Sequence, residues 1–335
     1  MIPLFRRASS RRGAKASALA TARKACTRQS HRMPELNDPE IYQSVLDGLE
    51  TGVYIVDRNR RIRFWNEGAE QITGYLRQDV VGRFLRDHLL TTGGNAKDVD
   101  SDPDDPINLV FRDGKSSIMD VSILHKDGYR VPIVLRTVPI RNGRGAVVGA
   151  AESFGKNCSA SDWTRRQAAF ADFGCLDATI GIPAQSFMET QLRENLTTFA
   201  EHNIPFGILL IRVDHLDQFR ANRGPGVVST ILRVVAQSIE NSLRPTDLLG
   251  CWGENQFIAV LLECKEYEVC LVGERVRRMI GRSEIEWWGD KFSVTSPLGG
   301  AGCRTGDEVE LLIARAEASL KESIGKGGNC VTVLR

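Results

Sequence analysis

Short runs of alternating apolar and polar residues, separated by Gly, Asn and Asp, make up the first part of the chain. This pattern predicts a helix over 39–50 and strands over 53–57 and 62–65. Asn66 is placed to cap a short helix that runs to Ile72, and Gly74 is placed to end it. A loop rich in Gly, Asp and Pro follows at 91–106, and three more strands are predicted at 117–125, 130–139 and 146–154. The order indicates an α+β domain built on an antiparallel sheet.

Two stretches of this region carry a family resemblance. They read GLETGVYIVDRNRRIRFWNEGAEQITGY at 48–75 and HKDGYRVPIVLRTVPIRN at 125–142, and GAVVGAAESF follows the second. Together they resemble a PAS domain over residues 39–155, which implies a sensory domain that forms homodimers. We predict no cofactor and leave the ligand of this domain open. His88 or His125 could ligate haem, although a lone His is more often a surface or capping residue. Asp57 and Asn66 are expected to shape a turn and a cap.

The pattern changes to longer alternating helices and strands from residue 177 onward. Residues 156–175 form a polar linker with an expected helix at 162–173. Helices are then predicted at 186–202, 226–243, 265–282 and 309–323, and strands at 206–213, 248–252, 255–262 and 292–300. The run 206–213 is apolar almost throughout, as in a strand that is buried on both faces. Gly253 and Glu254 are predicted to form a hairpin turn.

Several separated motifs in this half occur in the order of one known family. Residues 177–183 are similar to D-x-L-T-G-L-P, and residues 244–257 are similar to R-x-x-D followed by R-Y-G-G-D-E-F. Residues 316–320 and 327–329 fall where the family has A-D-x-A-L-Y and G-R-N. Residues 176–335 therefore resemble a GGDEF domain, the fold of diguanylate cyclases. The resemblance implies an α/β sandwich with a central sheet, and an activity that joins two GTP molecules into cyclic di-GMP with two divalent cations.

The positions that this family uses for chemistry hold other residue types. The Asp that binds metal in the family falls on Arg212, and a cation there repels a metal ion. The hairpin motif itself reads Gly253, Glu254, Asn255, Gln256, Phe257. Amides add no charge, so affinity for magnesium should fall sharply. The positions for guanine and phosphate contacts are changed as well, to Arg220, Ser229, Asp217, Ile324 and Gly328.

A register shift of two residues would put Asp214 where Arg212 stands in the comparison with the family. Gly224 and Leu232 fit the unshifted register, and no shift restores the acids of the hairpin. We therefore expect a degenerate GGDEF domain without a metal site and without cyclase activity.

Arg244 and Asp247 keep the R-x-x-D spacing, which in the family is the inhibitory site that binds cyclic di-GMP. An arginine can bind guanine or phosphate with two hydrogen bonds, and an aspartate can accept from guanine N–H groups. The alternative is local chain geometry, because Arg at a helix end and Pro after it are typical of a helix stop. Both interpretations stay open.

Charge divides the 335-residue chain into two parts. Residues 1–32 carry nine Arg or Lys and no acid, while the whole chain has a net charge of +2, so the remainder is acidic. We expect residues 1–38 to be a disordered basic tail, with a targeting segment, an arm for an anionic surface, or a true start at Met33 as alternatives. The acidic remainder gives no indication of nucleic-acid binding.

Eight cysteines are scattered without a CxxC pair, and no run of apolar residues is long enough for a membrane span. These features favour a cytoplasmic protein, and the two resemblances imply a bacterial one. The main hypothesis is a signalling protein in which PAS input is coupled to an inactive GGDEF domain that acts as a receptor or interaction module with an unidentified protein partner. The alternatives are an active diguanylate cyclase and a pure protein-interaction scaffold.

Overall fold

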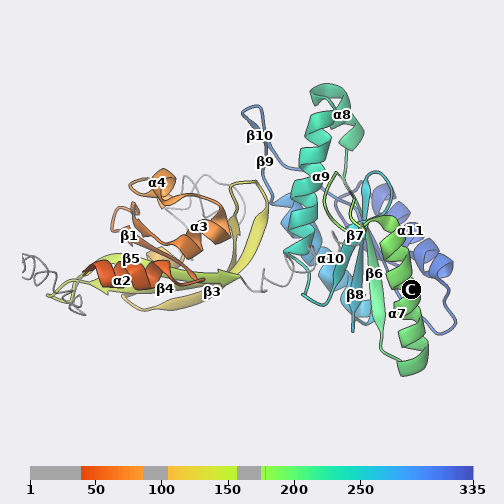
Figure 1. The fold of residues 1–335 in the computed structure, drawn as a ribbon, viewed down its shortest axis with the longest axis horizontal. Coiled ribbons are helices and arrows are strands. Elements are labelled where there is room, and N and C mark those ends of the chain that lie inside the picture. Colours follow the sequence, from red (N-terminus) through yellow and green to blue (C-terminus); the bar gives the residue numbers. More distant parts are fainter. Residues whose placement is uncertain (1–38, 86–104, 157–174, 178, 335) are drawn as a thin grey trace, which may run out of the picture. The chain divides into compact units, whose positions relative to one another are not determined.

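The computed structural model describes residues 39–85, 105–156, 175–177 and 179–334 (Figure 1). The predicted basic tail, His88, residues 91–104 of the predicted loop and the helix predicted at 162–173 lie outside the described residues. The first helix, α2 (Pro39–Asp47), matches the prediction and ends at Asp47 rather than Glu50.

The first sheet is antiparallel and has five strands in the order β2-β1-β5-β4-β3. The strands are β1 (Gly52–Asp57), β2 (Ile62–Trp65), β3 (Ser117–Leu124), β4 (Arg130–Arg141) and β5 (Val147–Lys156). Strands β1 and β5 are neighbours although about ninety residues separate them, with Tyr54 opposite Glu152. The predicted order of two strands, short helices and three antiparallel strands is confirmed.

Short helices cover one face of this sheet. α3 (Glu67–Thr73) begins at the predicted cap, because Asn66 Oδ1 accepts from the Ala69 N–H at 2.9 Å, and it ends at Gly74, whose φ is 75°. Helices α4 (Arg77–Val80) and α5 (Pro106–Asp113) were not predicted. Asp105 caps α5, and its side chain accepts from two backbone N–H groups. The core of this domain gathers around the fully buried Trp65.

The second sheet also has five strands, in the order β12-β11-β6-β8-β7. They are β6 (Phe206–Arg212), β7 (Leu248–Cys251), β8 (Gln256–Leu262), β11 (Leu298–Gly302) and β12 (Val331–Val333), of which β11 and β12 pair in parallel and the others antiparallel. The helices are α7 (Gln185–His202), α8 (Leu216–Arg223), α9 (Pro225–Glu240), α10 (Glu266–Gly281) and α11 (Val309–Gly325).

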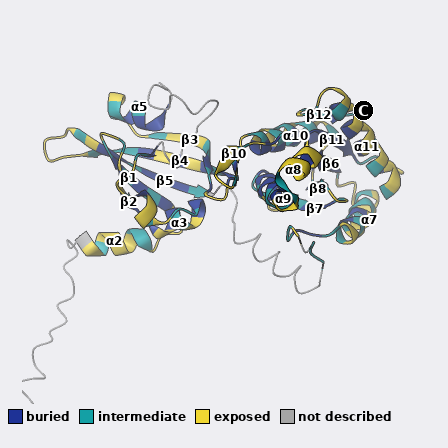
Figure 2. Cartoon of the chain, turned by 90° about the horizontal axis from the view of Figure 1, so that it is seen from above, coloured by how far each residue is buried: buried dark blue, intermediate teal, exposed yellow. Residues whose placement is uncertain are grey.

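Helices cover both faces of this sheet, so the predicted sandwich with a central sheet is confirmed (Figure 1). Leu209 and Ile211 of β6 face the layer of α9 and α10, and Ile208 and Leu210 face α7 and α11. Every residue of β6 from Phe206 to Ile211 is buried, and Figure 2 colours the chain by burial. The apolar run at 206–213 is therefore explained by a strand that is buried on both faces, as the sequence predicted.

The single strand predicted at 292–300 is wrong. Its first residue belongs to β10 (Asp290–Phe292), which pairs with β9 (Ile285–Trp287) in a separate hairpin, and its last residues belong to β11. Pro297 lies between the two strands and has no N–H for a sheet hydrogen bond. Within the described residues, no helix has both the length and the apolar character needed to cross a membrane.

Asn66 supports three segments of the first domain at once, which leads to a stability prediction. Besides capping α3, its Oδ1 accepts from Val53 N–H at 2.7 Å and its Nδ2 donates to Thr51 O at 2.9 Å. We expect Asn66→Ala to lower the free energy of unfolding of this domain by about 2–3 kcal/mol, because a buried cap and two further partners are lost. Urea unfolding followed by tryptophan fluorescence measures the change.

The matched control for this substitution is Asn142→Ala. Asn142 Oδ1 also accepts two backbone N–H groups, from Arg144 and Ala146, but in an exposed turn. The control should lower the free energy of unfolding by less than about 1 kcal/mol. Equal losses in the two variants would show that burial is not what makes Asn66 important.

Candidate functional site

A pocket of about 650 Å³ opens at one end of the second sheet, where β6 stops, α8 starts and the β7–β8 hairpin turns. The end of β6 contributes Arg212, and the hairpin contributes residues 253–256, the first four positions that correspond to the GGDEF motif. Most of the remaining wall consists of polar side chains. The lining residues are Gln185, Arg212, Val213, His215, Leu216, Asp217, Gln218, Trp252, Gly253, Glu254, Asn255 and Gln256.

Arg212 is held in the pocket by the pairing of the central strands. It lies directly opposite Gln256 in the β6–β8 ladder, and its N–H donates to Pro297 O at 3.2 Å. Its side chain is half-buried. The structure thus brings together Arg212 and Gln256, two positions that the sequence comparison aligns with acids of the family.

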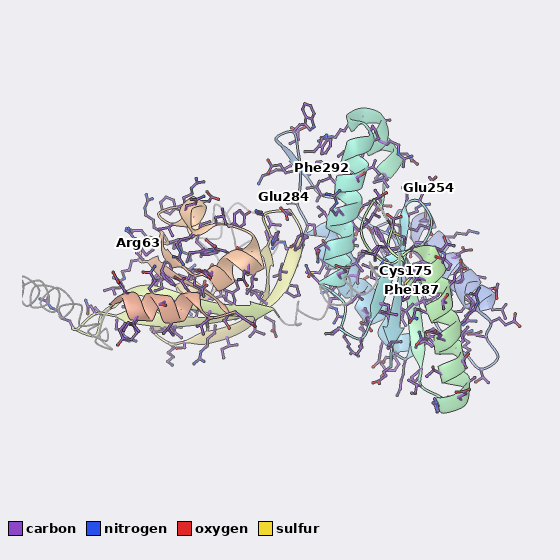
Figure 3. All side chains as sticks on the ribbon, viewed as in Figure 1. Arg63, Cys175, Phe187, Glu254, Glu284 and Phe292 are labelled. Atoms are coloured by element: carbon purple, nitrogen blue, oxygen red, sulfur yellow. The ribbon has the colours of Figure 1, made fainter. Side chains whose placement is uncertain are left out.

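The hairpin contains one residue with a positive φ and one buried polar atom without a hydrogen-bond partner. Gly253 has a φ of 82°, which suits a glycine in a tight turn. Glu254 is exposed and stands at the tip of the hairpin (Figure 3). Asn255 Oδ1 is buried and has no hydrogen-bond partner within the described residues. Phe257, the next residue but one, is fully buried and lies opposite Ile211, so it belongs to the core and not to the pocket.

Asp214 does not line this pocket. Its Oδ2 accepts from Thr295 Oγ1 at 2.7 Å, and its N–H donates to Thr295 O at 2.9 Å. Its carboxylate also meets the C-terminal loop, because a Cβ at Gly328 would lie 2.8 Å from Asp214 Oδ2. In this structure Asp214 is thus engaged with Thr295 and lies outside the residues that line the pocket.

The other positions with a changed residue type are divided between the pocket and its surroundings. Asp217 is exposed and lines the pocket, while Arg220 is exposed on α8 outside the lining residues. Ser229 is half-buried on α9, and Ile324 of α11 packs against the apolar cluster under α7 and α11. Within the described residues, no group of three or more His, Cys, Asp or Glu side chains is placed to hold a metal ion.

Arg244 and Asp247 lie in one turn between α9 and β7 but differ in burial. Arg244 is exposed, and Asp247 is 7% exposed. Asp247 Oδ2 accepts from Arg244 N–H at 2.9 Å, and its Oδ1 accepts from Leu262 N–H at 3.2 Å. Burial raises the pKa of Asp247, and these two hydrogen bonds act in the opposite direction. The aspartate therefore ties the turn to strand β8, while the arginine is open to solvent.

His125 of the first domain is integrated into the turn between β3 and β4. Its ring stacks on Tyr129 with 4.3 Å between the ring centres, and its Nδ1 accepts from Asp127 N–H at 3.1 Å. Asp57 shapes a turn as predicted, because its Oδ1 accepts from the N–H groups of Asn59 and Arg61.

Sequence reasoning gave no role to several pocket residues, namely Gln185, His215, Gln218 and Trp252. His215 precedes α8 with a φ of 57°, an uncommon value for a residue other than glycine. No local pattern indicates these positions, since they meet only when α7, α8 and the hairpin pack together. Glu152 was also missed, although it stands at an inward position of an alternating strand.

Comparison with known proteins identifies both halves of the chain. The family model described as "PAS fold" matches residues 40–152, and the model described as "Diguanylate cyclase, GGDEF domain" matches residues 175–330. Diguanylate cyclase DosC of Escherichia coli is 24% identical over 157 residues, which cover 47% of this chain and 34% of DosC. Diguanylate cyclase A of Treponema denticola is 26% identical over 161 residues, which cover 47% of this chain and 43% of the relative.

The chain thus spans less than half the length of these curated relatives. Among solved structures, the GGDEF domain of DgcB from Caulobacter crescentus, in complex with cyclic di-GMP, is 18% identical with a TM-score of 0.46. That similarity covers 48% of this chain and 93% of the DgcB chain. The two family matches, in the order in which the two sheets occur, identify this chain as a PAS domain followed by a GGDEF domain.

Proposed function

We propose that this protein is a cytoplasmic component of cyclic di-GMP signalling whose GGDEF domain does not synthesise cyclic di-GMP. In this proposal the PAS domain receives a signal and forms a homodimer, and the GGDEF domain acts as a receptor or as an interaction module. The observation that carries the proposal is Arg212 in the wall of the pocket, with Gln256 opposite it and Asn255 beside it.

The charge of Arg212 supports the proposal, because it opposes the binding of two metal ions at this site. At an effective dielectric of about 20, a divalent cation about 4 Å from a guanidinium is repelled by about 8 kcal/mol. Asn255 and Gln256 offer amide oxygens but no charge to offset that repulsion. The acids that do line the pocket, Asp217 and Glu254, are exposed and therefore strongly hydrated. Metal-assisted attack of a ribose hydroxyl on an α-phosphate has no support from this arrangement.

The receptor form of the proposal depends on Arg244. Its exposed side chain is available for bidentate hydrogen bonds to guanine or phosphate. Asp247 favours the interaction-module form, because both its oxygens already accept backbone N–H groups in the turn. Binding of cyclic di-GMP would therefore rest mainly on the arginine.

The dimer form of the proposal has support in the PAS sheet. Ile118 and Val134 are exposed on the same face, 66% and 37% respectively. Their paired partners on that face are Arg136 and Asp120, so a dimer contact there would combine aliphatic and charged side chains.

The first test is synthesis of cyclic di-GMP from GTP with Mg²⁺ or Mn²⁺. We expect no product above the blank, under conditions in which a cyclase such as DosC is measured in parallel. We expect the same from the triple variant Arg212→Asp, Asn255→Asp, Gln256→Glu, because the positions for guanine and phosphate contacts are changed as well. Turnover by the unmodified chain would refute the proposal, and strong turnover by the triple variant alone would limit the loss to the metal positions.

The second test is calorimetric titration of the full chain with cyclic di-GMP. The receptor form predicts binding at micromolar concentrations, weakened about tenfold or more in Arg244→Ala because a charge-assisted bidentate contact is lost. The matched control is Arg193→Ala, since Arg193 is exposed on α7 far along the chain from the turn. Absence of binding, or equal binding by all three proteins, would leave Arg244 and Asp247 as turn residues and favour the interaction module.

A further inference from the structure

A row of paired side chains crosses the entire PAS sheet. The strand registers place Trp65 opposite Tyr54, Tyr54 opposite Glu152, Glu152 opposite Thr137, and Thr137 opposite Ser117. Directly paired residues of antiparallel strands point to the same face of a sheet. Each of the five strands therefore contributes one side chain to the row, and a carboxyl group stands at its centre.

Glu152 is completely buried, at 0% exposed. Both of its carboxyl oxygens meet hydroxyl groups of neighbouring strands. Thr137 Oγ1 donates to Oε1 at 2.6 Å, and the Tyr54 hydroxyl donates to Oε2. Thr137 and Tyr54 are themselves 0% and 2% exposed. The carboxyl group thus joins β1, β5 and β4 through two buried hydrogen bonds.

The charged groups that face Glu152 come from two loops and offset each other in part. Asp105, the N-cap of α5, acts against ionisation of Glu152, and Arg60, in the β1–β2 turn, favours it. Arg60 is already engaged with Asp105 in an ion pair of 3.1 Å and donates to Asn108 Oδ1 at 2.6 Å. The buried residues of α3 and α5, which pack on β5, include no ionisable side chain; they are Gly68, Ala69, Ile72, Thr73, Pro106, Ile107 and Val110.

Burial raises the pKa of Glu152 to about 7, even though the hydrogen bonds from Thr137 and Tyr54 and the charge of Arg60 lower it. Burial also raises the pKa of Tyr54 well above its usual value, so this hydroxyl stays a donor at neutral pH. The carboxyl group therefore changes its charge in the range where most glutamates are fully ionised.

We propose that Glu152 is a proton-binding site that acts as a pH-sensitive switch in the PAS domain. In the protonated form the centre of the sheet is neutral, and in the ionised form a charge stands between β1, β5 and β4. Strand β5 carries Glu152 and runs to Lys156, where the segment toward the GGDEF domain begins. A change of charge at this position thus acts on the strand that leads out of the domain.

The sign of the pH dependence follows from linkage. Between the ordinary pKa of a glutamate, about 4.3, and the raised value in the folded state, the unfolded chain has released the proton and the folded domain still holds it. The contribution of Glu152 to stability is therefore full below about pH 4, falls as the pH rises toward 7, and is constant above that.

The direct test is a carbon NMR titration of the full chain labelled with ¹³C at the glutamate carboxyl groups. Glu152→Gln assigns the resonance. We expect this resonance to titrate with a midpoint near 7, while exposed glutamates titrate near 4.3. A midpoint in the ordinary glutamate range would refute the proposal.

A second measurement follows thermal unfolding of the PAS domain in the full chain between about pH 5 and about pH 8. The unmodified chain should lose several degrees of Tm over this range relative to Glu152→Gln, which cannot ionise. Glu67→Gln, at an exposed glutamate of the same domain, is the matched control and should retain the full decrease. Parallel pH profiles for the unmodified chain and Glu152→Gln would contradict the switch.

A third variant keeps the proposal testable if Glu152→Gln fails to fold. Thr137→Val keeps the size of the side chain and removes one donor to the ionised carboxylate. Loss of that donor should move the NMR midpoint of Glu152 upward, because a hydrogen bond to the charged form lowers a carboxyl pKa. An unchanged or lower midpoint would show that the hydroxyl does not control the proton.

Discussion

The burial of strand β6 on both faces is the constraint on which the GGDEF domain depends. Every side chain from Phe206 to Ile211 is buried, and alternate residues supply two separate apolar clusters. A slip by one residue would exchange these clusters, so the register with β8 and β11 is strongly specified. That register places Arg212 opposite Gln256 at the mouth of the pocket. The residue that stands in the pocket wall at the end of β6 is therefore set by the packing of the core.

The elements that could be predicted from sequence are those with strong local signals. Asn66 and Gly74 mark the ends of α3 because a cap and a positive φ demand particular residues, and the apolar run of β6 identifies a central strand without further context. Helix α8 was missed because its sequence, LDQFRANR, has few apolar positions, and only Leu216 is buried. The strand predicted at 292–300 failed because the apolar pattern runs across Pro297, while residues 293–297 belong to neither β10 nor β11 and Pro297 has no N–H to donate.

The residue types of the site could be predicted from the sequence, but the burial and contacts that result from tertiary packing could not. Arg212, Asn255 and Gln256 could be located by comparison with a family motif. The lack of a hydrogen-bond partner for the buried Asn255 Oδ1 could not be predicted, because this atom is buried by the packing of the hairpin. Glu152 is similar in this respect: its strand shows an inward position, but its two hydroxyl partners come from other strands, Tyr54 of β1 at a separation of 98 residues and Thr137 of β4 at a separation of 15. Burial in such a position costs free energy unless the carboxyl is hydrogen-bonded or neutral.

Several of the residues that this chain shares with the GGDEF motifs have a structural role in the fold. Gly253 has a positive φ and Phe257 fills the core, whereas Asn255 and Gln256 between them differ from the motif. Asp177 accepts from the N–H groups of Thr179 and Ile180, and Pro183 O accepts from Cys251 N–H, so the opening motif also serves a turn and a strand contact. Asp247 ties its own turn to β8. Residues in an open pocket contribute little to stability and can change at low cost, while buried ones cannot. Motif residues that serve turns, strand contacts and the core can therefore be kept while residues in the pocket change, so the presence of the shared motifs does not by itself establish cyclase activity.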